Sequence, residues 1–131
     1  MAQRKVLVVI PLTRPGSLDL ERVGSVVRNM GNGIRTRGLT PVFHVAYSAG
    51  GKKALRKAIG STSEELSFFK ARKDCGFGKT LIGLIDSGVK KHSPDFVMPG
   101  YGDYLRESEE TAGILKQAVR RNGPDFATGA W

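Results

Sequence analysis

Short apolar runs alternate along this chain with longer segments whose apolar residues recur at helical spacing. The first run, Lys5–Ile10, is rich in β-branched residues and is followed by proline, which is typical of a strand buried on both faces. The apolar face of the helix expected next consists of Leu20, Val23, Val27, Met30 and Ile34. Strands separated by helices of this length predict right-handed βαβ crossovers. The fold class we expect is therefore α/β, a three-layer sandwich with a mostly parallel sheet.

The same alternation continues along the rest of the sequence. We expect further strands over residues 41–47, 65–71, 95–98 and 125–128. Helices are expected between them, of which the first is short and basic and the last is ended by Gly123 and Pro124. No linker, internal repeat or low-complexity tract interrupts the pattern, so residues 1–131 are expected to form a single domain.

Charge narrows the choice of partner. Lysine and arginine outnumber aspartate and glutamate by 21 to 12, which gives a formal net charge of +9. The basic residues occur in small groups, such as Lys52-Lys53 with Arg56-Lys57. Such a surface attracts the phosphates of a nucleotide, a nucleic acid or an anionic lipid, although it can also serve solubility alone. Charge therefore predicts an anionic partner and does not choose among these.

The single cysteine and the length of the apolar runs bear on the compartment. Because Cys75 has no second cysteine to pair with, no intramolecular disulfide can form, and a reducing compartment is expected. The apolar run over residues 6–10 is too short for a membrane span. We therefore expect no transmembrane segment and a cytoplasmic location.

Ligands of parallel sheets bind beyond the carboxyl ends of the strands, which directs attention to the loops over residues 11–17, 48–52, 73–79 and 99–107. The Gly-Lys-Thr sequence at 78–80 is similar to the end of a phosphate-binding P-loop. Lys73 stands where that loop requires glycine, so a glycine turn at the start of a helix is favoured. His44 and His92 lie far apart in the chain, and we expect a structural role for His44 rather than metal binding.

Five segments together resemble a known family. They are Val6-Leu-Val-Val-Ile-Pro-Leu, Val45-Ala-Tyr-Ser-Ala-Gly-Gly, Ala71-Arg-Lys-Asp-Cys-Gly-Phe-Gly-Lys-Thr-Leu-Ile-Gly-Leu, Asp95-Phe-Val-Met-Pro-Gly-Tyr-Gly-Asp and Pro124-Asp-Phe-Ala-Thr-Gly-Ala-Trp. In order and spacing they resemble the nucleotide-sugar-binding half of family 2 glycosyltransferases. The fold implied by this resemblance is the GT-A fold, which is Rossmann-like. Tyr101 stands where the family has the first aspartate of Asp-x-Asp, and Asp103 matches the second.

The resemblance implies a ligand, a metal ion and a set of site residues. The ligand would be a nucleotide-diphosphate-sugar, and Asp103 would bind Mg²⁺ or Mn²⁺. The substrate-binding residues would be Pro11, Leu12, Thr13, Arg14, Ser48, Gly78, Lys79 and Tyr101. The chain would thus be a minimal glycosyltransferase-like protein. Transfer of the sugar is left open and no catalytic residue is assigned, because the family's catalytic base lies in an acceptor-binding half that these residues do not match.

Two other hypotheses stay open. The chain could be a non-enzymatic basic α/β domain that binds nucleic acid or another anionic partner through interleaved aromatic and basic residues, such as those over 68–73. The two phenylalanines of that segment, Phe68 and Phe69, fit the core of a strand better than a surface. Alternatively, the chain could form a homo-oligomer through a sheet edge and so complete a site.

Overall fold

The structure is a computed structural model that describes residues 4–12, 17–47, 52–60, 62–71, 77–100 and 109–126. Strands and helices alternate throughout. In chain order they are β1 (Lys5–Leu12), α1 (Ser17–Thr36), β2 (Thr40–Tyr47), α2 (Lys52–Ile59), β3 (Glu65–Lys70), α3 (Phe77–His92), β4 (Phe96–Pro99), α5 (Glu109–Asn122) and β5 (Asp125–Phe126). The predicted strand over 125–128 thus begins as expected, and its second half lies outside the described residues.

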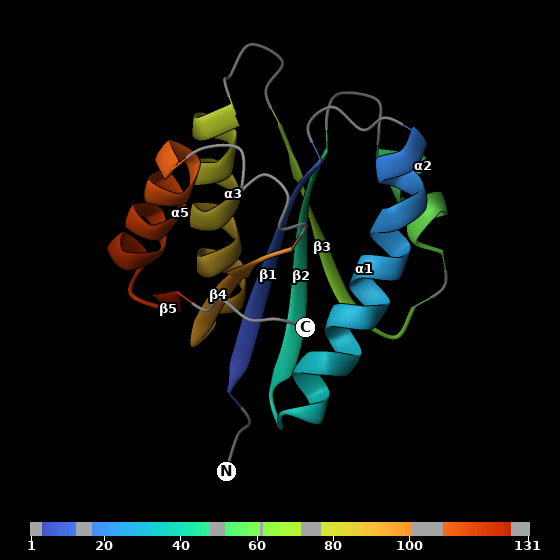
Figure 1. Cartoon of the computed structure of the whole chain (residues 1–131), viewed down its shortest axis with the longest axis horizontal. Coiled ribbons are helices and arrows are strands. Elements are labelled where there is room, and N and C mark those ends of the chain that lie inside the picture. Colours follow the sequence, from blue (N-terminus) through green and yellow to red (C-terminus); the bar gives the residue numbers. More distant parts are fainter. Residues whose placement is uncertain are drawn as a thin grey trace.

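The strands form one parallel sheet in the order β3-β2-β1-β4-β5. Helices α1 and α2 cover one face of this sheet, and α3 and α5 cover the other (Figure 1). The predicted fold class is therefore confirmed: the chain is a three-layer α/β sandwich with a parallel sheet. Since all strands run the same way, their carboxyl ends share one edge of the sheet, which we call the carboxyl edge.

The core consists of two apolar clusters on opposite faces of the sheet. Within β1, Val6, Val8 and Ile10 belong to the cluster under α1 and α2. Leu7 and Val9 alternate with them and belong to the cluster under α3 and α5. Because side chains of a strand alternate between faces, burial on both sides requires apolar residues at every position from Val6 to Ile10. This is why β1 reads as a continuous apolar run.

Strand β1 is longer than predicted, because it continues through Pro11 to Leu12 instead of ending at Ile10. The carbonyl of Val9 accepts a hydrogen bond from the Gly100 backbone N at 2.9 Å, so the peptide groups of Val9 face β4. Peptide groups alternate in direction along a strand, so Pro11 also faces that side, beyond the last β4 pairing at Val9. The missing N–H of Pro11 therefore costs no hydrogen bond between strands.

Each of the four described helices is followed by a residue with positive φ. Glycine occupies this position after α1, α2 and α5, as Gly38 (φ 77°), Gly60 (φ 73°) and Gly123 (φ 99°), of which Gly123 is the helix end predicted from the sequence. After α3 the residue is Ser93, with φ 48°. A side chain at such a φ is strained, since its Cβ crowds the following carbonyl oxygen. Helix α3 therefore ends without the glycine that usually relieves this strain.

Candidate functional site

The carboxyl edge is where the sequence predicted a ligand site, and the fold brings several of the predicted segments to it. Strands β1, β2 and β3 end there, and α1, α2 and α3 begin there (Figure 1). Pro11 and Leu12 are the last residues of β1, while Gly78 and Lys79 lie in the first turn of α3. The other residues predicted to bind the nucleotide-sugar or the metal ion lie outside the described residues; they are Thr13, Arg14, Ser48, Tyr101 and Asp103.

The strand order reverses between β1 and β4. From β1 the chain proceeds to β2 on one side, and the later strands β4 and β5 continue on the other. Such a switch point opens a crevice beyond the strand ends, where α/β proteins bind ligands. The segment that contains Arg14 leaves β1 here, and the segment that contains Asp103 leaves β4 here.

Gly100 holds the two strand ends together at the switch point. Its backbone N donates to the Val9 carbonyl at 2.9 Å. A Cβ at this position would lie 2.7 Å from Ile10 Cγ1 and 2.9 Å from Val8 Cγ1, which is closer than real contacts allow. Only glycine therefore permits this approach of the β4 end to β1.

Lysines surround the described part of the carboxyl edge. Lys52 and Lys53 begin α2, Lys79 lies in the first turn of α3, and Lys70 ends β3; all four are exposed. Neither α2 nor α3 has an acidic residue in its first turn. Because the helix dipole is positive at this end, each lysine there is unfavourable by about 0.3–1 kcal/mol. A bound phosphate would offset both the dipoles and the lysine charges.

The Gly-Lys-Thr sequence is part of a helix rather than of a loop that wraps a phosphate. Helix α3 begins at Phe77, so Gly78 and Lys79 already belong to its first turn. Lys79 is exposed, whereas Thr80 is buried. This arrangement agrees with the expectation of a helix start and leaves Lys79 available to an anion at the carboxyl edge.

A second group of polar residues, buried under α3, was not expected as a unit. The His44 ring lies between two serines, with Nδ1 2.6 Å from Ser67 Oγ and Nε2 2.7 Å from Ser87 Oγ. Ser67 Oγ also lies 2.8 Å from His92 Nε2. The structural role expected for His44 fits this buried environment. The two histidines, which are far apart in the sequence, are close in the fold, because their ring centroids lie 6.1 Å apart.

One arrangement of protons satisfies this chain of contacts. Ser87 Oγ donates to the Leu84 carbonyl, so it accepts from His44 Nε2–H. The Ser67 hydroxyl then donates to His44 Nδ1, at 2.6 Å, in preference to the Phe43 carbonyl at 3.4 Å, and its oxygen accepts from His92 Nε2–H. His44 is therefore neutral, and burial lowers its pKa to about 4, with smaller contributions from the charges of His92 and Lys91.

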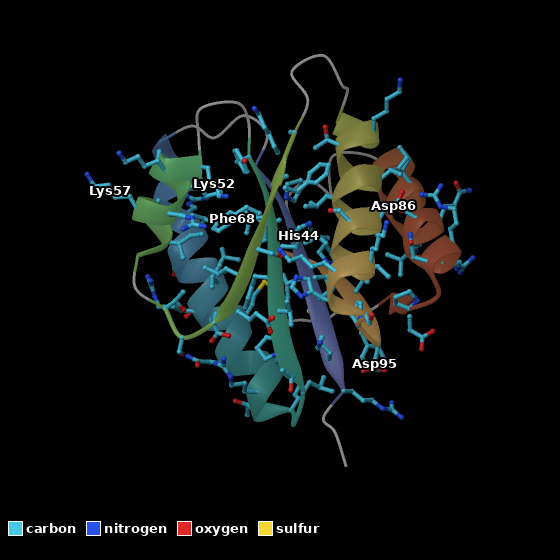
Figure 2. All side chains as sticks on the ribbon, turned by 180° about the vertical axis from the view of Figure 1, so that it is seen from behind. His44, Lys52, Lys57, Phe68, Asp86 and Asp95 are labelled. Atoms are coloured by element: carbon cyan, nitrogen blue, oxygen red, sulfur yellow. The ribbon has the colours of Figure 1, made fainter. Side chains whose placement is uncertain are left out.

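Ser67, His92 and Glu65 have the order of a hydrolytic triad, since His92 Nδ1 lies 3.9 Å from Glu65 Oε1. The Ser67 side chain, however, is buried within β3, and Ser67 is only 4% exposed. A substrate carbonyl cannot reach Oγ there, so the group is a buried structural network rather than a catalytic centre. Figure 2 shows His44 beneath α3, within the molecule.

The close approach of α3 to the sheet explains why His44 and Ser87 meet. A Cβ at Gly88 would lie 2.8 Å from Leu7 Cδ2 and 3.0 Å from His44 Cδ2, so glycine is needed for this packing. The strand register places His44 directly opposite Ser67. In the sequence, the only sign of this contact is a polar residue, His44, at an inward-facing strand position. The sequence does not show the register of β2 against β3, which brings His44 opposite Ser67.

Within the described ranges, no group of three or more His, Cys, Asp or Glu side chains could hold a metal ion. An open, shallow hollow lies at the opposite edge of the sheet, between the end of α3 and the end of α5, and is lined by Val89, Ser93, Pro94, Asp95, Asn122, Gly123 and Pro124. Its acidic residue, Asp95, accepts a hydrogen bond from the backbone N of Lys5 at 2.9 Å, so its carboxylate is bound to the first residue of β1.

The described structure thus defines an α/β domain with a basic carboxyl edge, and known structures agree with the fold. No family model and no curated protein matches the chain. A short-chain dehydrogenase/reductase variant from Serratia marcescens is similar at a TM-score of 0.51 and 14% identity over 92% of this chain. The chain spans about half of that protein, 51% of its length.

The C-terminal domain of PF1911 hydrogenase from Pyrococcus furiosus is similar at a TM-score of 0.50 and 12% identity. The match covers 99% of this chain and 94% of that domain. At these identities the two likenesses show a Rossmann-like α/β fold and nothing of activity. In the part of the chain that the structure describes, no helix has the length and apolar character to cross a membrane.

Proposed function

We propose that this chain is a nucleotide-binding domain that holds a nucleotide-diphosphate-sugar at the carboxyl edge, between the ends of β1 and β4. The main support is the reversal of strand order between these two strands, since ligands of open α/β sheets bind at such a point. The segments containing Arg14 and Asp103 both start there, as the resemblance to family 2 glycosyltransferases requires.

The proposed contacts to the diphosphate come from cations and helix N-termini. Lys79 is exposed in the first turn of α3, and Arg14 precedes α1 by two residues, Pro15 and Gly16, in the sequence. A diphosphate carries negative charge that complements the positive ends of α1 and α3. Lys79 and Arg14 would therefore fix the phosphates, and Pro11 and Leu12 would border the nucleoside.

The described residues at this edge do not by themselves fit a metal ion. They are rich in lysine, and the described ranges contain no cluster of metal-ligating side chains. Lysine ammonium groups can supply the counter-charge that a divalent cation supplies elsewhere. Mg²⁺ or Mn²⁺ at Asp103 is therefore a separate part of the proposal, and so is transfer of the sugar. A cytoplasmic location is proposed as well, because Cys75 has no second cysteine to pair with and the apolar run over residues 6–10 is too short for a membrane span.

Calorimetric titration tests the proposal. UDP- and GDP-sugars, UDP, UMP and pyrophosphate would be titrated into the whole chain with and without Mn²⁺. We expect the diphosphates to bind more tightly than UMP, and the double variant Arg14→Gln/Lys79→Gln to weaken diphosphate binding by about tenfold or more. The matched control is Lys90→Gln/Lys91→Gln, which also removes two exposed charges, from the last turn of α3. Asp103→Asn tests metal binding separately from diphosphate binding, because it should remove only the effect of Mn²⁺ on affinity.

Two outcomes would contradict nucleotide-sugar binding. One is the absence of binding to every nucleotide tested. The other is binding that Arg14→Gln/Lys79→Gln and Lys90→Gln/Lys91→Gln weaken equally, since that would show a general effect of net charge. Binding of pyrophosphate as tight as that of the nucleotide-sugars would reduce the site to a phosphate site.

A further inference from the structure

Helix α2 carries four cations on its exposed side, Lys52, Lys53, Arg56 and Lys57, which we call the α2 basic face. The helix contains no acidic residue. Its apolar side chains, Leu55 and Ile59, are 2% and 1% exposed and belong to the core cluster under α1 and α2. One side of α2 is thus fully used in folding, and the other side presents only positive charge and alanine.

Two of the four cations are held in place by an aromatic ring. Lys52 Nζ lies 5.7 Å and Arg56 Cζ 5.1 Å from the centroid of the Phe68 ring, on the edge strand β3. Lys53 and Lys57 form a second row, one helical turn apart. Figure 2 shows Lys52 beside Phe68 and Lys57 pointing away from the molecule. The cations are therefore arranged in two rows along the helix.

This arrangement is unfavourable for the isolated domain. Cations spaced four residues apart on a helix repel each other, and lysines at a helix N-terminus oppose the dipole. Elsewhere in the described structure two arginines have acidic partners: Arg35 pairs with Glu64 and Arg121 with Asp86. Among the described ion pairs none involves α2. An external polyanion would relieve this repulsion.

We infer that the α2 basic face binds the phosphate backbone of a nucleic acid without reading its sequence. Eight helical residues span about 12 Å, over which a duplex presents several phosphates, so four cations match a polyanion better than a single diphosphate. A membrane is a poorer fit, because surface helices insert apolar side chains into the bilayer and those of α2 are buried. Phe68 is half-buried and its ring already contacts Lys52 and Arg56, so the positive charges of α2 are offered to phosphates rather than the ring to bases.

Nucleic-acid binding can be measured by fluorescence anisotropy with labelled single-stranded RNA and duplex DNA of about 20 nucleotides at several salt concentrations. The test variant changes all four cations of the α2 basic face to glutamine. The matched control changes the exposed Lys90, Lys91, Lys116 and Arg120 of α3 and α5 to glutamine. Each variant lowers the net charge equally, from +9 to +5 (9 − 4 = 5). Circular dichroism would verify that both remain folded.

If four phosphates are contacted, the slope of log affinity against log salt should be about −3 to −4. We expect the α2 variant to lose about tenfold or more in affinity and most of this slope, the control to lose less than about threefold, and changes of sequence to matter little. Absence of binding, or equal losses in both variants, would overturn the inference. So would binding to phosphatidylserine vesicles in preference to both nucleic acids, which would point to a membrane. Arg14→Gln/Lys79→Gln should leave nucleic-acid affinity unchanged, so the failure of either proposal can be recognised separately.

Discussion

Mild acid should destabilise this protein through His44 at a pH where most carboxylates are still charged. Burial lowers the pKa of His44 to about 4, and the charges of His92 and Lys91 add to the effect. Burial also lowers the pKa of His92. The charge of Glu65 acts against this shift, and the charges of Lys91 and Lys5 add to it. These groups face the network from β1, β3 and α3, so both histidines are neutral in the folded protein at neutral pH.

The magnitude follows from the difference between the folded and unfolded states. In the unfolded chain the pKa of His44 returns to about 6.5. Between pH 6.5 and pH 4 the unfolded state binds a proton that the folded state does not, so the free energy of unfolding falls as the pH falls. At about 1.4 kcal/mol per pH unit, His44 should account for a loss of about 2 kcal/mol between pH 7.5 and pH 5. Above about pH 7 its contribution should be constant.

Urea unfolding followed by circular dichroism at several pH values between 7.5 and 5 would measure this loss. The variant His44→Gln keeps a hydrogen-bonding side chain and removes the titrating ring, so it should retain only the smaller part of the pH dependence that comes from His92. A wild-type free energy of unfolding that stays constant over this range would refute the reasoning. Survival of the full pH dependence in His44→Gln would refute it as well, because the proton would then bind elsewhere.

Three other substitutions test packing by the same unfolding measurement. Ser67→Ala should cost about 2 kcal/mol or more, since it leaves two buried histidine nitrogens without partners, whereas Ser25→Ala on the exposed side of α1 should cost less than about 0.5 kcal/mol. Ser93→Gly should stabilise by about 0.5–1 kcal/mol because it relieves the positive φ at the end of α3, and a loss of stability would contradict that strain. Gly100→Ala should cost about 1–3 kcal/mol by forcing apart β1 and β4, while Gly113→Ala, where no atom lies within 4 Å of the added Cβ, should be neutral or stabilising.

The fold could be predicted from the sequence because its signals are local. Burial of β1 on both faces is visible as the continuous apolar run Val6–Ile10, and the buried face of α1 is visible in the helical spacing of Val23 and Val27. The path of β1 through Pro11 was missed, because it depends on where β4 stops pairing. That is a property of two strands far apart in the chain.

The sites were harder to predict, because they depend on how distant segments meet. The sequence placed Lys79 at a helix start facing the carboxyl edge, which the parallel sheet confirms. From the sequence, His44 and His92 were considered as separate residues, although in the fold both rings lie within hydrogen-bond distance of Ser67 Oγ. That contact requires the register of β2 against β3 and the close packing of α3 at Gly88, and neither has a signature in a single sequence.

The charge of α2 provides a test of whether stability has been given up for binding. Lys53 is the second residue of α2 and lies one turn before Lys57. Lys53→Glu would place a favourable charge at the positive end of the helix dipole and turn a repulsive pair into an attractive one, so it should stabilise the fold by about 0.5–1.5 kcal/mol. If the α2 basic face binds nucleic acid, the same change should weaken that binding more than Lys53→Gln does. A gain in stability without loss of affinity would assign Lys53 to solubility alone, and a loss of stability would show that its charge is already balanced within the domain.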